Sequence, residues 1–211
     1  MDLMSAYLLI VLVLFAGNIA LVLGNSKITN QKLIIISAAL SIVIFILMNA
    51  SIYLNIALLD YFGYIFLIVA ISVFALMVYC TKNNNLNLLL YSILLIFIIL
   101  IILISTQANL DFIYTLLYSL LVFIILFVVY QLTKLLHHAK RQYSVIIGEY
   151  MCLTSILIFI FALTYNSTIT LDYTAFSPFL ILTPTYQLIY VIIGIVIVLV
   201  AGVLINDYRR K

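Results

Sequence analysis

Seven apolar stretches alternate along the chain with short polar joints, and this spacing restricts the fold more than any other feature. A stretch of roughly 20 residues, rising 1.5 Å per residue as an α-helix, crosses a hydrocarbon core of roughly 30 Å. We therefore predict seven transmembrane helices, at about 5–24, 33–56, 61–80, 88–106, 112–133, 144–165 and 186–206. With 68% hydrophobic and 7% charged residues, the chain lacks the polar surface that a water-soluble fold needs. The sequence predicts an all-α, polytopic membrane helix bundle, with residues 1–211 as a single integral membrane domain.

Basic residues occur only in every second joint and at the C-terminus. They are Lys27, Lys32, Lys82, Lys134, Lys140, Arg141, Arg209, Arg210 and Lys211. The other joints carry Asp60, Asp111 and Asp172 instead. Because cytoplasmic loops are enriched in lysine and arginine, we expect the N-terminus outside, the C-terminus in the cytoplasm, and a multi-pass protein of the cell membrane. The net charge of +3 is spread over separate loops, so it gives no reason to expect nucleic acid as a partner.

Glu149 is the one acid that these boundaries place inside the bilayer. It lies five residues into a span that begins near Ser144, which is about 7–8 Å below the boundary. A charged carboxylate at that depth costs on the order of 1–3 kcal/mol unless it pairs, reaches the interface or takes up a proton. We therefore expect a functional site at Glu149, partnered by Lys140, by Arg141 or by a tyrosine hydroxyl. The alternative is that the span begins later and that Glu149 points into the headgroups or caps a helix.

Two adjacent histidines, His137 and His138, precede Lys140 and Arg141 in the same joint. Neighbouring residues on a helix point about 100° apart, and no third ligand stands at the i+4 spacing, so we expect no metal site here. The pair is either a solvated feature next to the membrane or a group that collects protons for Glu149.

Uncharged polar residues in the first two spans are expected to hydrogen-bond across helices. They are Asn18, Ser37, Ser41, Asn49 and Asn55. Tyrosines cluster near the ends of the spans, which is typical of a belt at the membrane interface. This group comprises Tyr7, Tyr53, Tyr61, Tyr64, Tyr79, Tyr114, Tyr130, Tyr143, Tyr165, Tyr173, Tyr186 and Tyr208.

Several activities are disfavoured by missing motifs. The last span has no lysine to hold retinal, no paired glutamates accompany an intramembrane arginine or histidine, and neither G-x-S-x-G nor a P-loop is present. We therefore expect no catalytic residue, no cofactor and no bound metal in this chain.

Residues 141–152, Arg-Gln-Tyr-Ser-Val-Ile-Ile-Gly-Glu-Tyr-Met-Cys, carry a family resemblance. A basic loop that enters a helix through Ile147-Gly148-Glu149, followed by Thr154-Ser155, resembles the second helix of the three-helix K subunit of respiratory complex I and of its counterparts in cation/proton antiporters. The segment Pro184-Thr185-Tyr186-Gln187, which opens the last span, is similar to the Pro-x-x-Gln before the third helix of the antiporter version. Residues 113–211 would then form the three-helix module. The four spans before it match the layout of seven-span relatives in energy-converting membrane nickel–iron hydrogenases.

The resemblance implies a non-catalytic integral membrane subunit of an ion-translocating redox complex, whose partners are the lipid bilayer and other membrane subunits. In that family the acid of the second helix belongs to a lateral proton path, and this role would pass to Glu149 alone. Residues 188–205 contain no charge, although relatives often continue the path in the third helix. The alternatives are a stand-alone small membrane transporter or sensor and, with less support, a membrane enzyme that acts alone.

Overall fold

The computed structural model describes residues 3–26, 28–51, 53–54, 58–83, 85–108, 110–136 and 143–169. Within these ranges it has no strand, and its helices are α1 (Leu3–Gly24), α2 (Asn30–Ser51), α3 (Phe62–Asn83), α4 (Leu86–Ser105), α5 (Phe112–Leu136) and α6 (Tyr143–Ile169), with a short 3-10 helix, η1 (Leu59–Tyr61), before α3. All six α-helices are long and apolar enough to cross a membrane. The protein is thus an all-α, multi-pass membrane protein.

The helices belong to a compact unit, Met1–Asn166. Of the second unit, Ser167–Lys211, the structure describes only the last three residues of α6. The seventh predicted span, 186–206, and most of the third part of the predicted module 113–211 lie outside the described residues.

The predicted boundaries of the first six spans agree with the helices to within three or four residues, except at the end of α2. This helix ends at Ser51, whereas the sequence predicted a span to residue 56. At this end the Asn49 amide donates to the Phe45 carbonyl at 2.8 Å, and the Ser51 hydroxyl donates to the Met48 carbonyl at 2.7 Å. Such side-chain bonds to the backbone favour helix ends and turns. The prediction for α2 was therefore too long because it counted apolar residues alone.

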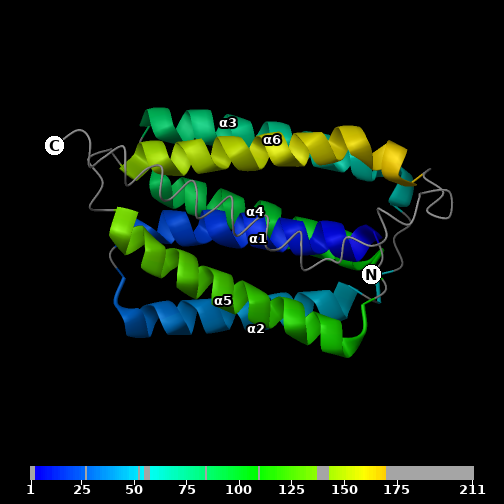
Figure 1. Ribbon diagram of the computed structural model, residues 1–211, viewed down its shortest axis with the longest axis horizontal. Coiled ribbons are helices and arrows are strands. Elements are labelled where there is room, and N and C mark those ends of the chain that lie inside the picture. Colours follow the sequence, from blue (N-terminus) through cyan, green and yellow to red (C-terminus); the bar gives the residue numbers. More distant parts are fainter. Residues whose placement is uncertain are drawn as a thin grey trace, which may run out of the picture. The chain divides into compact units, whose positions relative to one another are not determined.

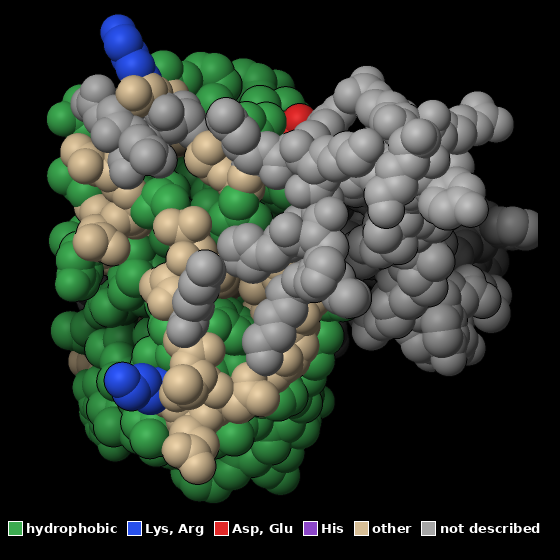
Figure 2. Space-filling view, turned by 90° about the vertical axis from the view of Figure 1, so that its left-hand side faces the viewer, with side chains coloured by type: hydrophobic (Ala, Val, Ile, Leu, Met, Phe, Trp, Pro, Cys, Tyr) green, Lys and Arg blue, Asp and Glu red, His purple; other side chains and the backbone are tan. Residues whose placement is uncertain are grey.

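Successive helices run antiparallel, so the joints alternate between the two ends of the bundle (Figure 1). Lys32 in the first turn of α2 and Lys82 in the last turn of α3 lie at one end. Asp60 in η1 and Asp111 before α5 lie at the other end. Figure 2 faces the basic end and shows lysine side chains standing out from a body that is mostly hydrophobic. The segregation of charge that the sequence predicted is present among the described residues.

Helix α1 is the most deeply buried helix of the unit. In its most apolar stretch 78% of the residues are buried, against 22–39% in the other five helices. Every residue from 14 to 24 is buried, and these three turns cover all sides of the helix. Its neighbours are α4 and α5 along its length, α3 through Tyr7 and Phe66, and α6 through hydrogen bonds. The other helices keep one apolar side exposed, as lipid contact requires.

An aromatic cluster joins α1, α3 and α6 at the end opposite the lysines. The Tyr7 ring lies 5.6 Å from the Phe66 ring, 5.4 Å from the Phe161 ring and 5.9 Å from the Tyr165 ring. Phe62 also contacts Phe66 and Tyr165. Edge-on and tilted contacts of this kind add to the stabilisation that comes from buried area.

This cluster corrects part of the predicted tyrosine belt. Tyr53, Tyr61, Tyr64, Tyr79 and Tyr114 are exposed near helix ends, as a belt requires. Tyr7, Tyr130 and Tyr165 are instead buried, and the interfacial prediction was wrong for these three. Their rings fill the gaps between helices, and the Tyr130 hydroxyl donates to the Ile28 carbonyl at 2.8 Å.

Gly24 marks the point where α1, α5 and α6 converge. A Cβ atom at this position would overlap the Tyr143 hydroxyl of α6 and the side chain of Thr133 of α5. Close approach of membrane helices commonly depends on such small residues.

We predict that Gly24→Ala lowers the free energy of unfolding by about 1–3 kcal/mol, because the added methyl group would overlap the Tyr143 hydroxyl and the Thr133 side chain, which must shift. Thermal unfolding in mild detergent measures the effect. Ala39→Val, on the exposed side of α2, is the control and should leave the midpoint nearly unchanged. Equal stability of Gly24→Ala and the parent protein would contradict the close contact.

Candidate functional site

Glu149 lies on the outward side of α6. The helix begins at Tyr143, so Glu149 stands six residues in, or about 9 Å along the helix axis. It is exposed, and it shares one side of the helix with Val145, Leu153, Ile156, Ile160 and Leu163, which are all exposed as well. The carboxylate therefore interrupts an otherwise apolar stripe at helical spacing.

The predicted partners of Glu149 lie outside the described residues. These are His137, His138, Lys140 and Arg141, in the joint between α5 and α6. Helix α5 continues past its predicted end at 133 to Leu136. The structure thus shows the position of Glu149 and the two helix ends that flank the joint. The pairing of the Glu149 carboxylate with Lys140 or Arg141 stays a prediction.

Both ends of this joint contact α1, one through a hydrogen bond and the other through packing. Tyr143, the first residue of α6, donates its hydroxyl proton to the Leu21 carbonyl of α1 at 2.5 Å. Thr133, in the last turns of α5, is buried beside Gly24 and donates to the Tyr130 carbonyl at 2.7 Å. The beginning of α6 is therefore fixed, and with it the side of the helix that carries Glu149.

A second set of polar contacts lies on the opposite, buried side of α6. The Asn18 amide of α1 donates to the Thr154 hydroxyl at 3.0 Å, and the Ser155 hydroxyl donates to the Ala70 carbonyl of α3 at 2.9 Å. The Tyr150 hydroxyl lies close to Gly17 of α1. Sequence reasoning noted Thr154 and Ser155 only as part of a motif and missed Tyr150. The signal available in the sequence was the four-residue spacing between Tyr150 and Thr154, which places both on one side of a helix.

The outcome for the other predicted cross-helix polar residues is mixed. Asn18 does bond across helices, and the Ser41 hydroxyl donates to the Ser119 carbonyl of α5 at 2.7 Å. Asn49 bonds instead to its own helix, so that prediction was wrong, and Asn55 lies outside the described residues. The Ser37 hydroxyl is buried and has no hydrogen-bond partner among the residues that the structure describes.

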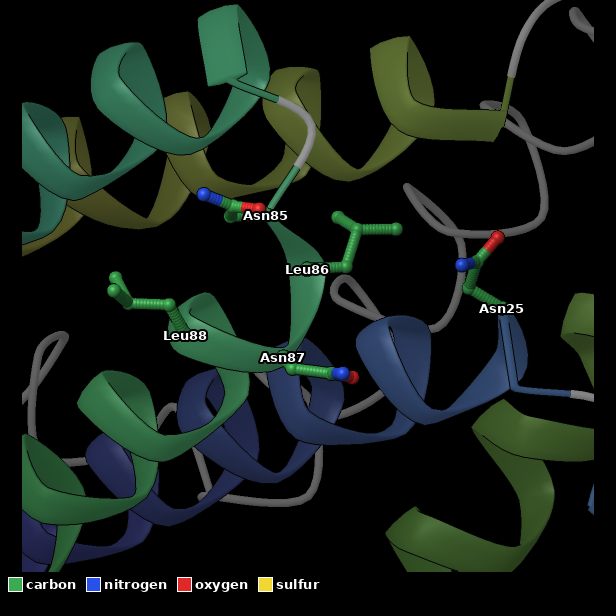
Figure 3. Close-up of a pocket in the computed structure, with 5 residues that line it drawn as sticks. All are labelled: Asn25, Asn85, Leu86, Asn87 and Leu88. Carbon is green, nitrogen blue, oxygen red and sulfur yellow. The ribbon is translucent and has the colours of Figure 1, made fainter.

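A pocket of about 450 Å³ opens at the basic end, where α1 ends and α4 begins. Asn25 follows α1, while Asn85, Leu86, Asn87 and Leu88 come from the start of α4 (Figure 3). Its lining offers neutral amides and apolar side chains, with no ionisable group among them. The asparagine amides of this lining can both donate and accept hydrogen bonds, and the lining lacks the groups for acid–base chemistry.

The described residues hold no group of three or more His, Cys, Asp or Glu side chains that could bind a metal ion. The buried polar side chains of these residues are all asparagine, serine or threonine, apart from the buried tyrosines. Of the acids in this part of the chain, Glu149 is thus the one that lies within a membrane helix.

No family model, curated protein or solved structure matches this chain.

We predict that Tyr143→Phe lowers the free energy of unfolding by about 0.5–1.5 kcal/mol, because the Leu21 carbonyl loses its side-chain donor. Tyr79→Phe, an exposed tyrosine in the last turns of α3, is the matched control and should have little effect. Chemical or thermal unfolding of both variants in detergent makes the comparison. A larger loss for the control than for Tyr143→Phe would show that the contact does not fix α6.

Proposed function

We propose that this chain is a non-catalytic integral membrane subunit of an ion-translocating redox complex in the cell membrane, and that Glu149 belongs to a proton path shared with a neighbouring subunit. The observation that carries the proposal is the position of Glu149 on the outward, apolar side of α6. The motif around Glu149 supports it, since it resembles the second helix of the complex I K-subunit family.

An acid within a membrane helix normally faces the interior of a bundle, a water-filled cavity or a partner. Glu149 faces away from α1, because the buried side of α6 carries Tyr150, Thr154 and Ser155. A lateral path along the side of the subunit accounts for this direction, since the carboxyl group can exchange a proton with a group on the adjoining chain. His137, His138, Lys140 and Arg141, in the joint before α6, would supply protons or charge from the cytoplasmic side.

The same proposal accounts for the neutral interior. A stand-alone transporter for an ion needs ionisable or strongly polar groups that converge inside the bundle. The described residues of the interior provide scattered serines, threonines and one asparagine, with no buried charged side chain. A supporting subunit whose ionisable group lies at its edge agrees better with this distribution than a stand-alone transporter or sensor does.

We further propose the complete topology: seven spans with the seventh at 186–206, the N-terminus outside and the C-terminus in the cytoplasm. The clustering of Lys32 and Lys82 at one end of the bundle, with Asp60 and Asp111 at the other, supports this orientation. Under this topology residues 113–211 form the three-helix module, in the layout of energy-converting nickel–iron hydrogenase subunits.

Cysteine labelling in intact cells tests the orientation. In a background with Cys80 and Cys152 replaced by serine, Asp60→Cys and Asp111→Cys should react with a membrane-impermeant maleimide. Asn25→Cys and Asn85→Cys should react only after the cells are opened. All four positions are exposed, so accessibility within the fold does not bias the comparison. The reverse pattern would show that the orientation is inverted.

We expect Glu149→Gln to assemble normally and to slow proton-coupled turnover of the parent complex by about tenfold or more, because the amide keeps the shape and removes the titratable proton. Glu149→Asp should be milder, since the carboxyl group remains and is withdrawn by one methylene. Native gel electrophoresis of membranes measures assembly, and proton uptake by inverted vesicles during redox turnover measures the path.

Asp60→Asn is the matched control, because it removes one acid at the opposite end of the bundle. It should change neither assembly nor turnover. Wild-type turnover in both Glu149 variants would rule out the proton path. Purification of the native protein as a monomer that binds and moves a solute would rule out the subunit role itself.

A further inference from the structure

Asn18 is a polar side chain enclosed within the membrane unit. It lies on α1 and is 2% exposed, with its amide nitrogen 3.0 Å from the Thr154 hydroxyl of α6. The Thr154 hydroxyl donates its own proton to the Tyr150 carbonyl at 2.9 Å. Since a hydroxyl has a single proton to donate, Thr154 can only accept from Asn18. This arrangement fixes the Asn18 amide with its nitrogen toward α6.

The other end of the same amide is unsatisfied. The Asn18 Oδ1 atom is buried and has no hydrogen-bond partner among the described residues. Turning the amide over would place Oδ1 against a hydroxyl whose proton is already used, and would leave the NH₂ group without an acceptor. Neither orientation satisfies the side chain with protein atoms alone. A buried carbonyl oxygen without a donor is strongly unfavourable in an apolar medium.

A second polar group without a partner lies one turn away on the facing helix. Tyr150 precedes Thr154 by four residues, so both side chains project from the same side of α6. The Tyr150 hydroxyl lies close to Gly17, the residue directly before Asn18, and makes no hydrogen bond within the part of the chain that the structure describes. Two facing positions thus present a buried acceptor that lacks a donor and, near it, a hydroxyl that can donate, beside Gly17 and Thr154.

We propose that a buried water molecule occupies the contact between α1 and α6 at Asn18, donating a hydrogen bond to Asn18 Oδ1 and accepting one from the Tyr150 hydroxyl. Buried waters typically make two to four hydrogen bonds to polar groups that would otherwise be unsatisfied, and Asn18 and Tyr150 supply two. The site is independent of the proton path at Glu149, which lies on the other side of α6.

A double-mutant cycle tests the shared water through thermal unfolding of the full chain in detergent. Asn18→Leu and Tyr150→Phe each remove one of its two partners while nearly preserving side-chain volume. Each should lower the midpoint by about 2–4 °C, and the double mutant should lose clearly less than the sum, because the first change already expels the water. Tyr130→Phe is the matched control, since its hydroxyl bonds directly to the Ile28 carbonyl. Its effect should add to that of Asn18→Leu.

Additive losses for Asn18→Leu and Tyr150→Phe would overturn the proposal, and so would a higher midpoint for Asn18→Leu, which would indicate a dry and strained asparagine. A structure of the wild-type protein at a resolution that shows waters provides the direct observation. Density between Asn18 Oδ1 and the Tyr150 hydroxyl is the expected result, and an empty position or a protein donor there overturns it. This observation, with Tyr150→Phe alone, decides the question if Asn18→Leu does not fold.

Discussion

Inside a bilayer, the lipid tails are as apolar as the side chains of a helix, so hydrophobicity alone does not tell a helix which neighbours to choose. The arrangement of this protein therefore depends on close approach and on hydrogen bonds between helices. Both converge on α1: Gly24 admits Thr133 and Tyr143, and Gly17 admits the Tyr150 hydroxyl. Helices α4 and α5 pack along this central element, and α2 packs in turn on α5 and α4.

Several hydrogen bonds between the described helices run from a side-chain hydroxyl to a backbone carbonyl. Ser41, Tyr143 and Ser155 each donate to a carbonyl of another helix. A helix carbonyl can accept a second hydrogen bond without losing the one inside its own helix, because its oxygen has two lone pairs. The side-chain hydroxyl therefore finds an acceptor in the backbone, and no second polar side chain is needed. This explains how the interior is joined with so few polar residues, and Asn18 is the exception because an amide brings both a donor and an acceptor.

The sequence predicted the six described spans well because apolar length is a local property, visible in any window of about 20 residues. It did not predict that α1 is central, because apolar length is shared by all six described helices and does not tell which of them the others surround. The small residues Ala16, Gly17, Ala20 and Gly24 were the available signal. The direction of Glu149 was equally hidden, because α6 carries apolar residues all around and only its contacts with Asn18 and Ala70 decide which side faces outward. Those partners lie 136 and 85 positions away along the chain.

The burial of α1 also has a consequence for how the protein is made. This helix precedes in the chain every neighbour that covers it, so α1 enters the membrane before them and reaches its final surroundings only after α6 has emerged from the ribosome. Until then Asn18 and the glycine positions of α1 face lipid or the insertion machinery. The interior is therefore completed at a late stage of translation, and a chain released before α6 would present to the bilayer the same small and polar surface that the finished protein encloses.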